Sequence, residues 1–362
     1  MPLIPFARFS FPNPAFKAGP IEERLRQHLL QILMAKEKDD YRFNPSGQPP
    51  KEWSELDLPL AKTRRIRQRA ADIAACYANR SPFSRLRSED QQRLTPIKAG
   101  IEGVSIPSEH RADEIAAALQ DEYPWMGAVN DKILHAMRRS VRRGDPAFRM
   151  PPMVLSGPPG IAKTHLGATL GEKIGVPSLI YESTSQGASF GLVGSQKGWS
   201  NAEPGQLIDM LLTERVANLV VVVDELEKAG SVMSSKGQVF DLAASLLPLL
   251  EPMSAARWTC PYFKLPFNLS WINWIITVND HRSLSAPLLS RCPPIHVPYP
   301  TRDHLVRFAG REGQRRDLSD TSIEAIGEAL TRAMKQGYQP DLRVVLRMLD
   351  LAEDLENRPT LH

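Results

Sequence analysis

The chain contains few cysteines and no long apolar segment. Its three cysteines, Cys76, Cys260 and Cys292, lie far apart and form no Cys-x-x-Cys pair. A disulfide framework or a zinc site is therefore not expected, and a reducing compartment fits. We expect each cysteine to be a small buried apolar residue.

No apolar run approaches the roughly 20 residues that a membrane-spanning helix needs. Prolines interrupt the first residues (MPLIPFARFSFPNP), where an export signal needs an unbroken apolar segment. The sequence therefore predicts a cytoplasmic protein with no membrane segment.

What is present fits a globular protein of two or three domains. Its 362 residues are 42% hydrophobic and 24% charged, with a formal net charge of +4. These values exclude the wholly disordered and membrane-embedded classes. The 31 prolines exceed the usual share of about 5%, so rigid loops are expected. A net charge this small does not demand nucleic acid as a partner.

The first third of the chain differs from the rest. It carries the basic excess, which is concentrated in Lys62, Arg64, Arg65, Arg67 and Arg69. It is also rich in proline, and apolar periodicity predicts helices around residues 20–38 and 61–80. We predict a mostly helical accessory or partner-binding region over residues 1–112.

From about residue 112 the sequence alternates between helical and strand patterns. An amphipathic helix pair over residues 112–142 is interrupted at Pro124. The predicted strands are Met153–Leu155, Leu179–Tyr181, Leu219–Val223, Trp271–Val278 and Ile295–Val297. The β-branched run Val220–Val223 is typical of a strand buried on both faces. This alternation predicts an α/β domain with a doubly wound parallel sheet over residues 113–299, followed by helices over 300–362.

A phosphate-binding loop follows the first of these strands. It consists of Gly157, Pro158, Pro159, Gly160, Ile161, Ala162, Lys163 and Thr164, with His165 next. In a P-loop, backbone amides and a helix N-terminus hold the phosphates, Lys163 reaches the β and γ oxygens, and Thr164 binds Mg²⁺. Ala162 stands where the pattern usually has glycine. A simple Gly/Pro turn would not need Lys-Thr at this spacing, so ATP and Mg²⁺ are the predicted cofactors.

An acidic pair follows the valine strand. Asp224 would lie at the carboxyl edge of the sheet, near the metal that Thr164 holds. Glu225 would act as the general base that polarises the attacking water. An Asp-Glu pair after a strand can also be a plain helix start, but the P-loop upstream favours the functional interpretation.

Several segments taken together resemble a known family. They are GPPGIAKT, GSQKGWSNAEPGQL, VVVVDELEKAG, LLPLLEP, YFKLPFNLSWINWIITVND and SAPLLSRCPPI. Their order and spacing over about residues 121–310 resemble the ATPase module of the AAA+ superfamily, and most of all that of the Lon proteases. A few extra residues lie around 233–238, and the alanine in the P-loop resembles the MoxR branch. The resemblance implies an AAA+ large domain, a P-loop NTPase fold, followed by a small helical lid domain.

The resemblance also implies two further catalytic residues besides Lys163 and Glu225. Asn279 matches the sensor-1 position, which would hold the hydrolytic water; an ordinary Asn-Asp turn is the alternative. Arg291 matches the arginine finger, which acts on the γ-phosphate of a neighbouring subunit; a surface arginine is the alternative. A finger acting in trans implies a ring of identical subunits, most often a hexamer in this family.

Two other matches concern the lid and the ring channel. Arg343 best matches the sensor-2 arginine, although another register places Pro340 there, and an ordinary helix-surface arginine is the alternative. Trp199 matches the aromatic pore-loop residue that grips polypeptide, and its glycine and small polar neighbours suit an exposed loop. A partly buried tryptophan that anchors a loop is the alternative.

The sequence favours an ATP-driven remodeller of a protein partner recruited by residues 1–112. We expect a Lon-like motor without a protease, because residues 301–362 leave room only for a lid. The alternative is a nucleic-acid-linked loader or remodeller that uses residues 62–69. Such a charge run is usually a solvated helix face, and no aromatic platform accompanies it. A scaffold with little turnover is disfavoured because Asp224 and Glu225 are both present.

Overall fold

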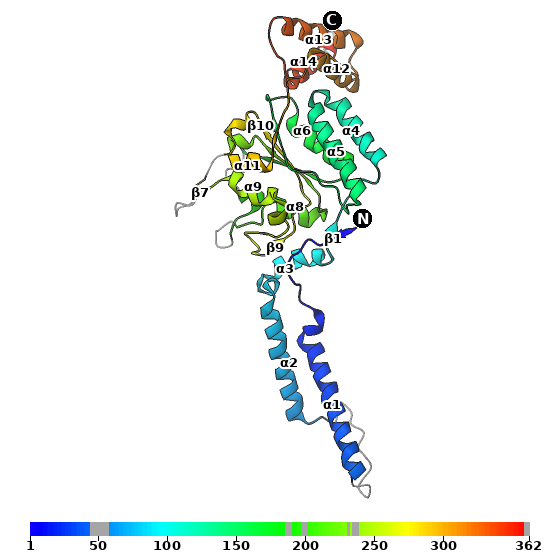
Figure 1. Cartoon of the computed structure of the whole chain (residues 1–362), viewed down its shortest axis with the longest axis vertical. Helices are drawn as coiled ribbons and strands as arrows, with labels where there is room; N and C mark the ends of the chain where they lie inside the picture. The colour runs from blue at the N-terminus through cyan, green and yellow to red at the C-terminus, as the bar shows by residue number, and fades with distance from the viewer. Residues whose placement is uncertain (44–57, 185–189, 197–201, 230–231, 234–238, 358–362) are drawn as a thin grey trace. The chain divides into compact units, whose positions relative to one another are not determined.

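The computed structural model describes residues 1–43, 58–184, 190–196, 202–229, 232–233 and 239–357 (Figure 1). The chain forms two compact units. The core unit comprises residues 1–6 and everything from residue 99 onward, and the inserted unit comprises residues 7–98. The domain boundaries at residues 112 and 299 stay predictions.

A parallel five-stranded sheet lies at the centre of the core unit. Its strands are β3 (Met153–Ser156), β4 (Ser178–Glu182), β5 (Val220–Asp224), β10 (Asn273–Val278) and β11 (Pro294–His296). They are arranged in the order β11-β3-β10-β5-β4, and every neighbouring pair is parallel. All residues of β3 and β10 are buried, as are the four valines of β5. The predicted α/β class with a parallel sheet is therefore confirmed.

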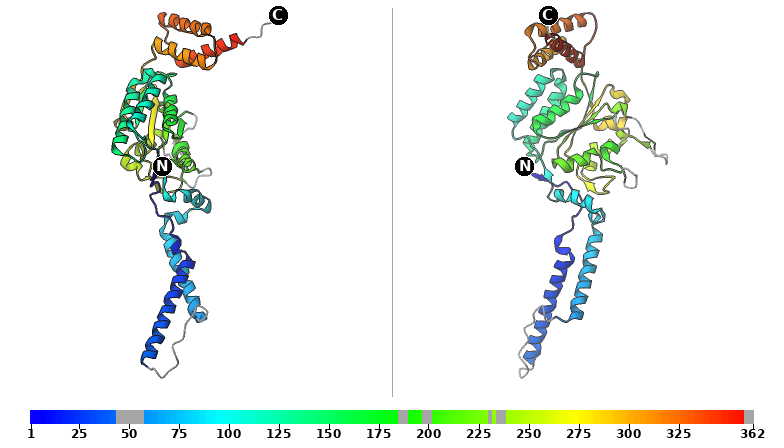
Figure 2. Two further views of the ribbon diagram at one scale, coloured as in Figure 1. Left: turned by 90° about the vertical axis from the view of Figure 1, so that its right-hand side faces the viewer. Right: turned by 180° about the vertical axis from the view of Figure 1, so that it is seen from behind.

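Helices cover the sheet on both sides (Figures 1 and 2). They are α4 (Glu109–Glu122), α5 (Gly127–Arg143), α6 (Lys163–Ile174), α7 (Phe190–Val193), α8 (Gln206–Glu214), α9 (Leu242–Leu250), α10 (Pro252–Ala255) and α11 (Ala286–Arg291). The helices α4, α5 and α6 lie together on one side, and α8, α9 and α11 lie on the other. Pro124 separates α4 from α5, as expected, because proline lacks the amide that a continuing helix needs.

Three helices form the predicted lid after the last strand. They are α12 (Arg302–Arg315), α13 (Asp320–Lys335) and α14 (Leu342–Glu356). Each begins at a side-chain cap, provided by Thr301, Ser319 and Asp341, which satisfies amides that the first turn leaves unpaired. Their apolar faces join the same buried cluster as the core helices.

The remaining elements of the described residues are short strands and 3-10 helices. The two-stranded pairs are β1 (Leu3–Ile4) with β2 (Ile101–Glu102), β6 (Val232–Met233) with β7 (Val239–Phe240), and β8 (Trp258–Thr259) with β9 (Pro266–Phe267). Short 3-10 helices are η1 (Pro14–Phe16), η3 (Pro82–Arg85), η4 (Thr95–Ala99), η5 (Pro124–Met126), η6 (Leu226–Lys228) and η7 (His281–Ser283). Among the described helices, none is long and apolar enough to cross a membrane.

The inserted unit is built on a helical hairpin. Its helices are α1 (Ala18–Phe43), α2 (Leu60–Arg80) and α3 (Ser88–Leu94), and α1 and α2 lie side by side (Figure 2). A two-helix hairpin offers few buried positions, and Ala70 is the buried residue of α2. Cys76 on α2 is exposed, so the expectation of burial was wrong there, whereas Cys260 and Cys292 are buried.

The first six residues are part of the core unit although the inserted unit follows them in the chain. In the β1–β2 pair, Leu3 lies opposite Glu102 and Ile4 opposite Ile101. Phe6 is 1% exposed, and its ring centroid lies 5.1 Å from that of Phe267. The inserted unit is therefore tethered to the core unit by chain at both of its ends.

We predict that Phe6→Ala lowers the free energy of unfolding of the core unit by about 3–5 kcal/mol, because it removes a buried ring. Leu3→Ala is the matched control, since the side chain of Leu3 is 56% exposed. Chemical denaturation followed by tryptophan fluorescence measures both. An equal, small effect of the two substitutions would contradict the assignment of residues 1–6 to the core unit.

Candidate nucleotide site

The P-loop residues connect β3 to α6 at the carboxyl edge of the sheet. The loop turns back at Gly157, where a Cβ atom would lie 2.2 Å from the carbonyl oxygen of Val297. Gly160 has φ +74°, and a Cβ there would lie 2.0 Å from Asp341 Oδ2. Both positions therefore need glycine, because neither has room for a side chain.

Ala162 adopts the conformation that glycine usually supplies in this loop. Its φ and ψ are 68° and 27°, in the left-handed region, and α6 begins at the next residue. For a residue other than glycine, this backbone conformation costs roughly 1–2 kcal/mol of free energy. The alanine therefore keeps the glycine geometry at the cost of local backbone strain.

The Lys163 ammonium is held inside the loop. It donates hydrogen bonds to the carbonyl oxygens of Gly157 (2.6 Å) and Pro158 (2.7 Å) and to Asn279 Oδ1 (3.3 Å). Burial lowers the pKa of Lys163, and the carboxylates of Glu227, Asp224 and Glu225 oppose that shift. Lys163 is therefore a partly desolvated cation that the P-loop holds in place through two of its carbonyl oxygens.

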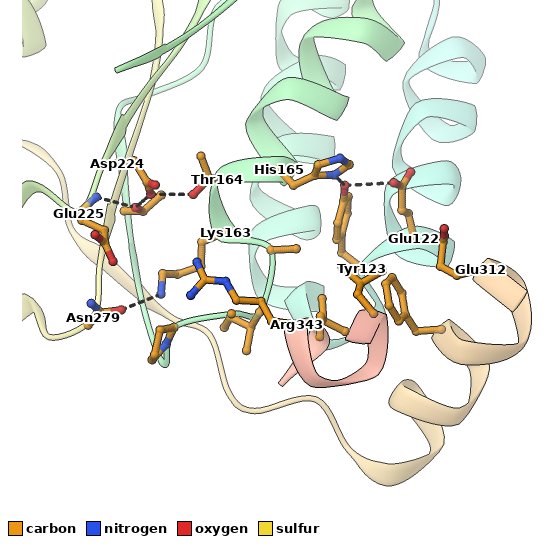
Figure 3. Close-up of a pocket in the computed structure, with 18 of the residues that line it drawn as sticks. Glu122, Tyr123, Lys163, Thr164, His165, Asp224, Glu225, Asn279, Glu312 and Arg343 are labelled. Atoms are coloured by element: carbon orange, nitrogen blue, oxygen red, sulfur yellow. Dashed lines mark hydrogen bonds between the residues drawn. The ribbon is translucent and has the colours of Figure 1, made fainter. Parts of the chain in front are cut away.

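The two predicted metal-binding residues meet directly. Thr164 Oγ1 donates to Asp224 Oδ1 at 2.6 Å (Figure 3). Asp224 also accepts a hydrogen bond from the Thr277 hydroxyl on β10. In turn, Thr277 Oγ1 accepts the Glu225 amide at 3.1 Å. Thr277 thus links the end of β5 to β10, a role that no sequence motif indicates.

Glu225 also has a left-handed backbone, with φ 50° and ψ 49°. Its carboxylate pairs with the Lys228 ammonium at 2.8 Å, and the Glu225 side chain is 29% exposed. Strained backbone conformations of this kind cluster at functional sites. The turn at Glu225 directs the chain from β5 into η6 beside the P-loop.

Glu227, two residues farther on, is a second residue that the sequence did not single out. Its Oε1 accepts the Asn279 amide at 2.8 Å. Its Oε2 is buried and has no hydrogen-bond partner. Glu227 therefore fixes the loop that carries Asn279 next to Lys163.

A cavity of about 400 Å³ brings most of the predicted residues together. Its lining includes Pro159, Gly160, Ile161, Ala162, Lys163, Thr164, His165, Asp224, Glu225, Asn279 and Arg343. Gly157 and Pro158 form the base of the loop through their carbonyl groups. The lid contributes Phe308, Leu342 and Leu346 to the same cavity, so it has an apolar as well as a charged side.

The lid contacts the P-loop where α14 begins. The Leu342 amide donates to the Gly160 carbonyl oxygen at 3.0 Å. Arg343 in the first turn of α14 points toward Lys163 (Figure 3), and its charge contributes to the lowered pKa of Lys163. Of the two registers left open by the sequence, the structure brings Arg343 to the cavity; Pro340 does not line it.

A polar cluster lies at the other end of the cavity. The Tyr123 hydroxyl lies 2.5 Å from His165 Nδ1 and 2.7 Å from Thr169 Oγ1, and Glu122 Oε1 lies 3.1 Å away. Burial raises the pKa of the Tyr123 hydroxyl, so it stays protonated. The sequence analysis did not single out these residues; the helix break at Pro124, directly after the Tyr123 that caps α4, is the signal that could have found them.

One predicted residue lies elsewhere, and another falls outside the described residues. Arg291 ends α11 and lines a different cavity, where it donates to the Pro287 carbonyl oxygen at 3.0 Å. Trp199 lies outside the described residues. No cluster of three or more His, Cys, Asp or Glu side chains arranged to hold a metal ion occurs in the described part of the chain.

Comparison with known proteins agrees with this geometry. Residues 153–298 match the model of the family described as "ATPase family associated with various cellular activities (AAA)". The core of the chain resembles the ATPase module of Lon proteases.

Three Lon relatives illustrate the extent of this similarity. Lon protease 4 of Sorangium cellulosum is 28% identical over 59% of this chain, and the Lon protease of Halothermothrix orenii is 29% identical over 58%. The peroxisomal Lon protease homolog 2 of Arabidopsis thaliana is 27% identical over 64%. The chain spans about a quarter (26%) of the length of each of these relatives. The similarity to Lon therefore concerns the AAA+ core.

We predict that Ala162→Gly raises the free energy of unfolding by up to about 1 kcal/mol, because it relieves a left-handed alanine. Ala168→Gly is the matched control within α6, where glycine costs about 1 kcal/mol. Urea denaturation measures the free energy of unfolding, which should rise in Ala162→Gly and fall in Ala168→Gly. If both substitutions destabilise the protein equally, the left-handed geometry at residue 162 is wrong.

Proposed function

We propose that this chain is an AAA+ ATPase that hydrolyses ATP in a ring of identical subunits, a homohexamer, and uses the energy to remodel a protein partner. The observation that carries the ATPase part is the single cavity that joins Lys163, Thr164, Asp224, Glu225 and Asn279. The residues fit a magnesium-bound triphosphate. Thr164 Oγ1 and Asp224 Oδ1 converge to 2.6 Å, and the Lys163 ammonium lines the same cavity.

Each side chain then has a defined task. ATP supplies the reactive phosphoanhydride and Mg²⁺ neutralises its phosphates. Lys163 binds the β and γ oxygens, and Thr164 and Asp224 hold the metal directly or through water. Glu225 would orient and polarise the attacking water once its carboxylate leaves Lys228, and Asn279 would hold the same water. Arg343 contacts the γ-phosphate from the lid.

We predict that Glu225→Gln reduces ATP turnover by about 10²–10⁴-fold while ATP still binds, because the amide retains the shape but cannot accept a proton. Lys163→Ala should instead weaken binding, since it removes the buried cation. Phosphate release and equilibrium binding of a fluorescent ATP analogue separate the two effects. Unchanged turnover in Glu225→Gln would refute the assignment of the base.

The remodelling part of the proposal rests on the similarity to Lon and on Trp199. We predict that Trp199→Ala keeps basal ATP hydrolysis but loses its stimulation by an unfolded protein such as casein. Trp199→Tyr, which keeps an aromatic ring, should retain stimulation. If Trp199→Ala loses basal hydrolysis and stability together, Trp199 anchors a loop and the motor assignment is wrong.

The alternative is a nucleic-acid-linked ATPase that uses the basic residues 62–69. On the inserted unit, Tyr77 stacks on Phe16 at 4.1 Å, with Arg80 over the Tyr77 ring and Arg24 over the Phe16 ring. The two rings contact each other and the guanidinium groups, so this stack adds basic side chains but is not itself an open platform for a base. Salt-sensitive stimulation of hydrolysis by single-stranded DNA or RNA would favour this alternative.

A further inference from the structure

The inserted unit contains a groove of its own. The volume of the groove is about 540 Å³, and its lining comes from within residues 10–18 and 74–81. The first segment contains η1 and the start of α1, and the second is the end of α2 with the residue that follows it. This volume lies in the range of ligand-binding pockets, about 300–1,000 Å³. We call this space the hairpin groove.

Two contacts hold the wall that residues 10–18 provide. The Ser81 hydroxyl donates to the Ser10 carbonyl oxygen at 2.7 Å, which ties the start of this segment to the end of α2. The ring centroid of Phe11 lies 4.9 Å from that of Phe83, which is 5% exposed. The hairpin groove is therefore shaped by contacts within the inserted unit, as a binding site that is formed in advance requires.

The surface of the hairpin groove along α2 is apolar and open to solvent. Alanines supply much of this surface, and Ala75 and Ala78 are exposed. Tyr77, which also lines the groove, is 41% exposed. Small side chains leave room for a large apolar side chain of another molecule to lie against α2. A few such anchors in well-packed pockets carry most of the binding free energy of many protein interfaces.

The charge in the hairpin groove has one sign. Lys17 and Arg80 line it, and no acidic side chain among the described residues does so. Nearer the start of α2, the run from Lys62 to Arg69 adds five basic residues. A surface with this charge favours an acidic partner, because complementary charges speed the encounter and like charges exclude basic partners.

The aromatic rings of the groove favour a protein segment over nucleic acid. Phe16 and Tyr77 stack on each other at 4.1 Å, and the guanidinium groups of Arg24 and Arg80 lie over the two rings. Nucleic-acid bases bind to aromatic side chains by stacking on their faces. Here the rings already stack on each other and on guanidinium groups, whereas the alanines of α2 offer an apolar surface to a side chain.

We propose that the hairpin groove binds an acidic segment of the protein partner. One large apolar side chain of this segment packs on the alanines of α2, and the acidic residues that flank it pair with Lys17 and Arg80. This inference rests on the proposed remodelling of a protein partner, and it assigns the recruitment of that partner to the inserted unit.

Fluorescence anisotropy of labelled peptides, titrated with the full chain in the absence of ATP, tests this inference. The probes are short peptides in which glutamates flank one central phenylalanine, leucine or tryptophan. We expect saturable binding of at least one probe. Binding should weaken by at least about tenfold when alanine replaces the central residue of that probe, or when glutamine replaces its glutamates.

Two variants locate the binding in the groove. Lys17→Glu/Arg80→Glu reverses the charge of the groove, and Ala75→Trp fills it while both cations stay in place. Each variant should weaken probe binding by at least about tenfold. Circular dichroism checks that both variants keep the helix content of the wild type.

Each variant has a matched control. Lys36→Glu/Lys38→Glu makes the same change of net charge at exposed residues of α1, and Ala71→Trp adds the same ring at an exposed residue of α2 that does not line the groove. Lys36 lies about 27 Å along α1 from Ala18, at 1.5 Å per residue. Charges at that distance are screened, so both controls should bind the probes nearly as the wild type does.

The remaining outcomes overturn the inference. If Lys17→Glu/Arg80→Glu and Lys36→Glu/Lys38→Glu weaken binding equally, the attraction belongs to the overall charge and not to the groove. Absence of saturable binding by every probe also refutes it. If single-stranded DNA binds instead of the peptides and Ala75→Trp abolishes that binding, the groove binds nucleic acid.

The same measurements separate this inference from the proposed function. If casein stimulates ATP hydrolysis while the groove binds no probe, the proposed function stands and the inference is wrong. If the wild type hydrolyses no ATP, the proposed function fails. Peptide binding, measured without ATP, still decides whether the groove takes an acidic segment.

Discussion

The Asp224 carboxylate accepts hydrogen bonds from Thr164 at the start of α6 and from Thr277 on β10, and the candidate site is organised around this meeting point. The register of the sheet makes it possible. β10 pairs with both β3 and β5, with Ile276 opposite Val223 and Thr277 opposite Leu155. A slip of one residue would turn the Thr277 hydroxyl to the other face of the sheet and remove it from Asp224. The central parallel sheet therefore determines the chemistry at its carboxyl edge.

The backbone strain at the candidate site and the contact of the lid with the P-loop belong to the same carboxyl edge of the sheet. Ala162 and Glu225 both have left-handed backbones, and both line the nucleotide cavity. Such strain persists only where surrounding contacts hold it. Here Glu225 is held through its amide, which donates to Thr277, and the P-loop is held by the bond from Leu342 to Gly160. The start of α14 is thus part of the phosphate loop's support as well as one wall of the cavity.

The strands and P-loop could be predicted because their signals are local. The buried run Val220–Val223 indicates a central strand, and the P-loop spacing alone indicates a phosphate site. Contacts between distant segments could not be predicted in this way. The pairing of Leu3–Ile4 with β2 is too short to give a periodic signal, and Glu227 and Thr277 gain their roles only when η6 and β10 meet. The Phe16–Tyr77 stack likewise needs the hairpin to fold first.

The central claim is that this one cavity binds a magnesium nucleotide, and calorimetric titration with ATP in Mg²⁺ and in EDTA tests it most directly. We expect one ATP per chain, bound more tightly in Mg²⁺. In Thr164→Ala, which removes the hydroxyl beside Asp224, most of the gain from Mg²⁺ should be lost while binding in EDTA is retained. Absence of binding by the wild type, or a full magnesium effect in Thr164→Ala, would contradict the account.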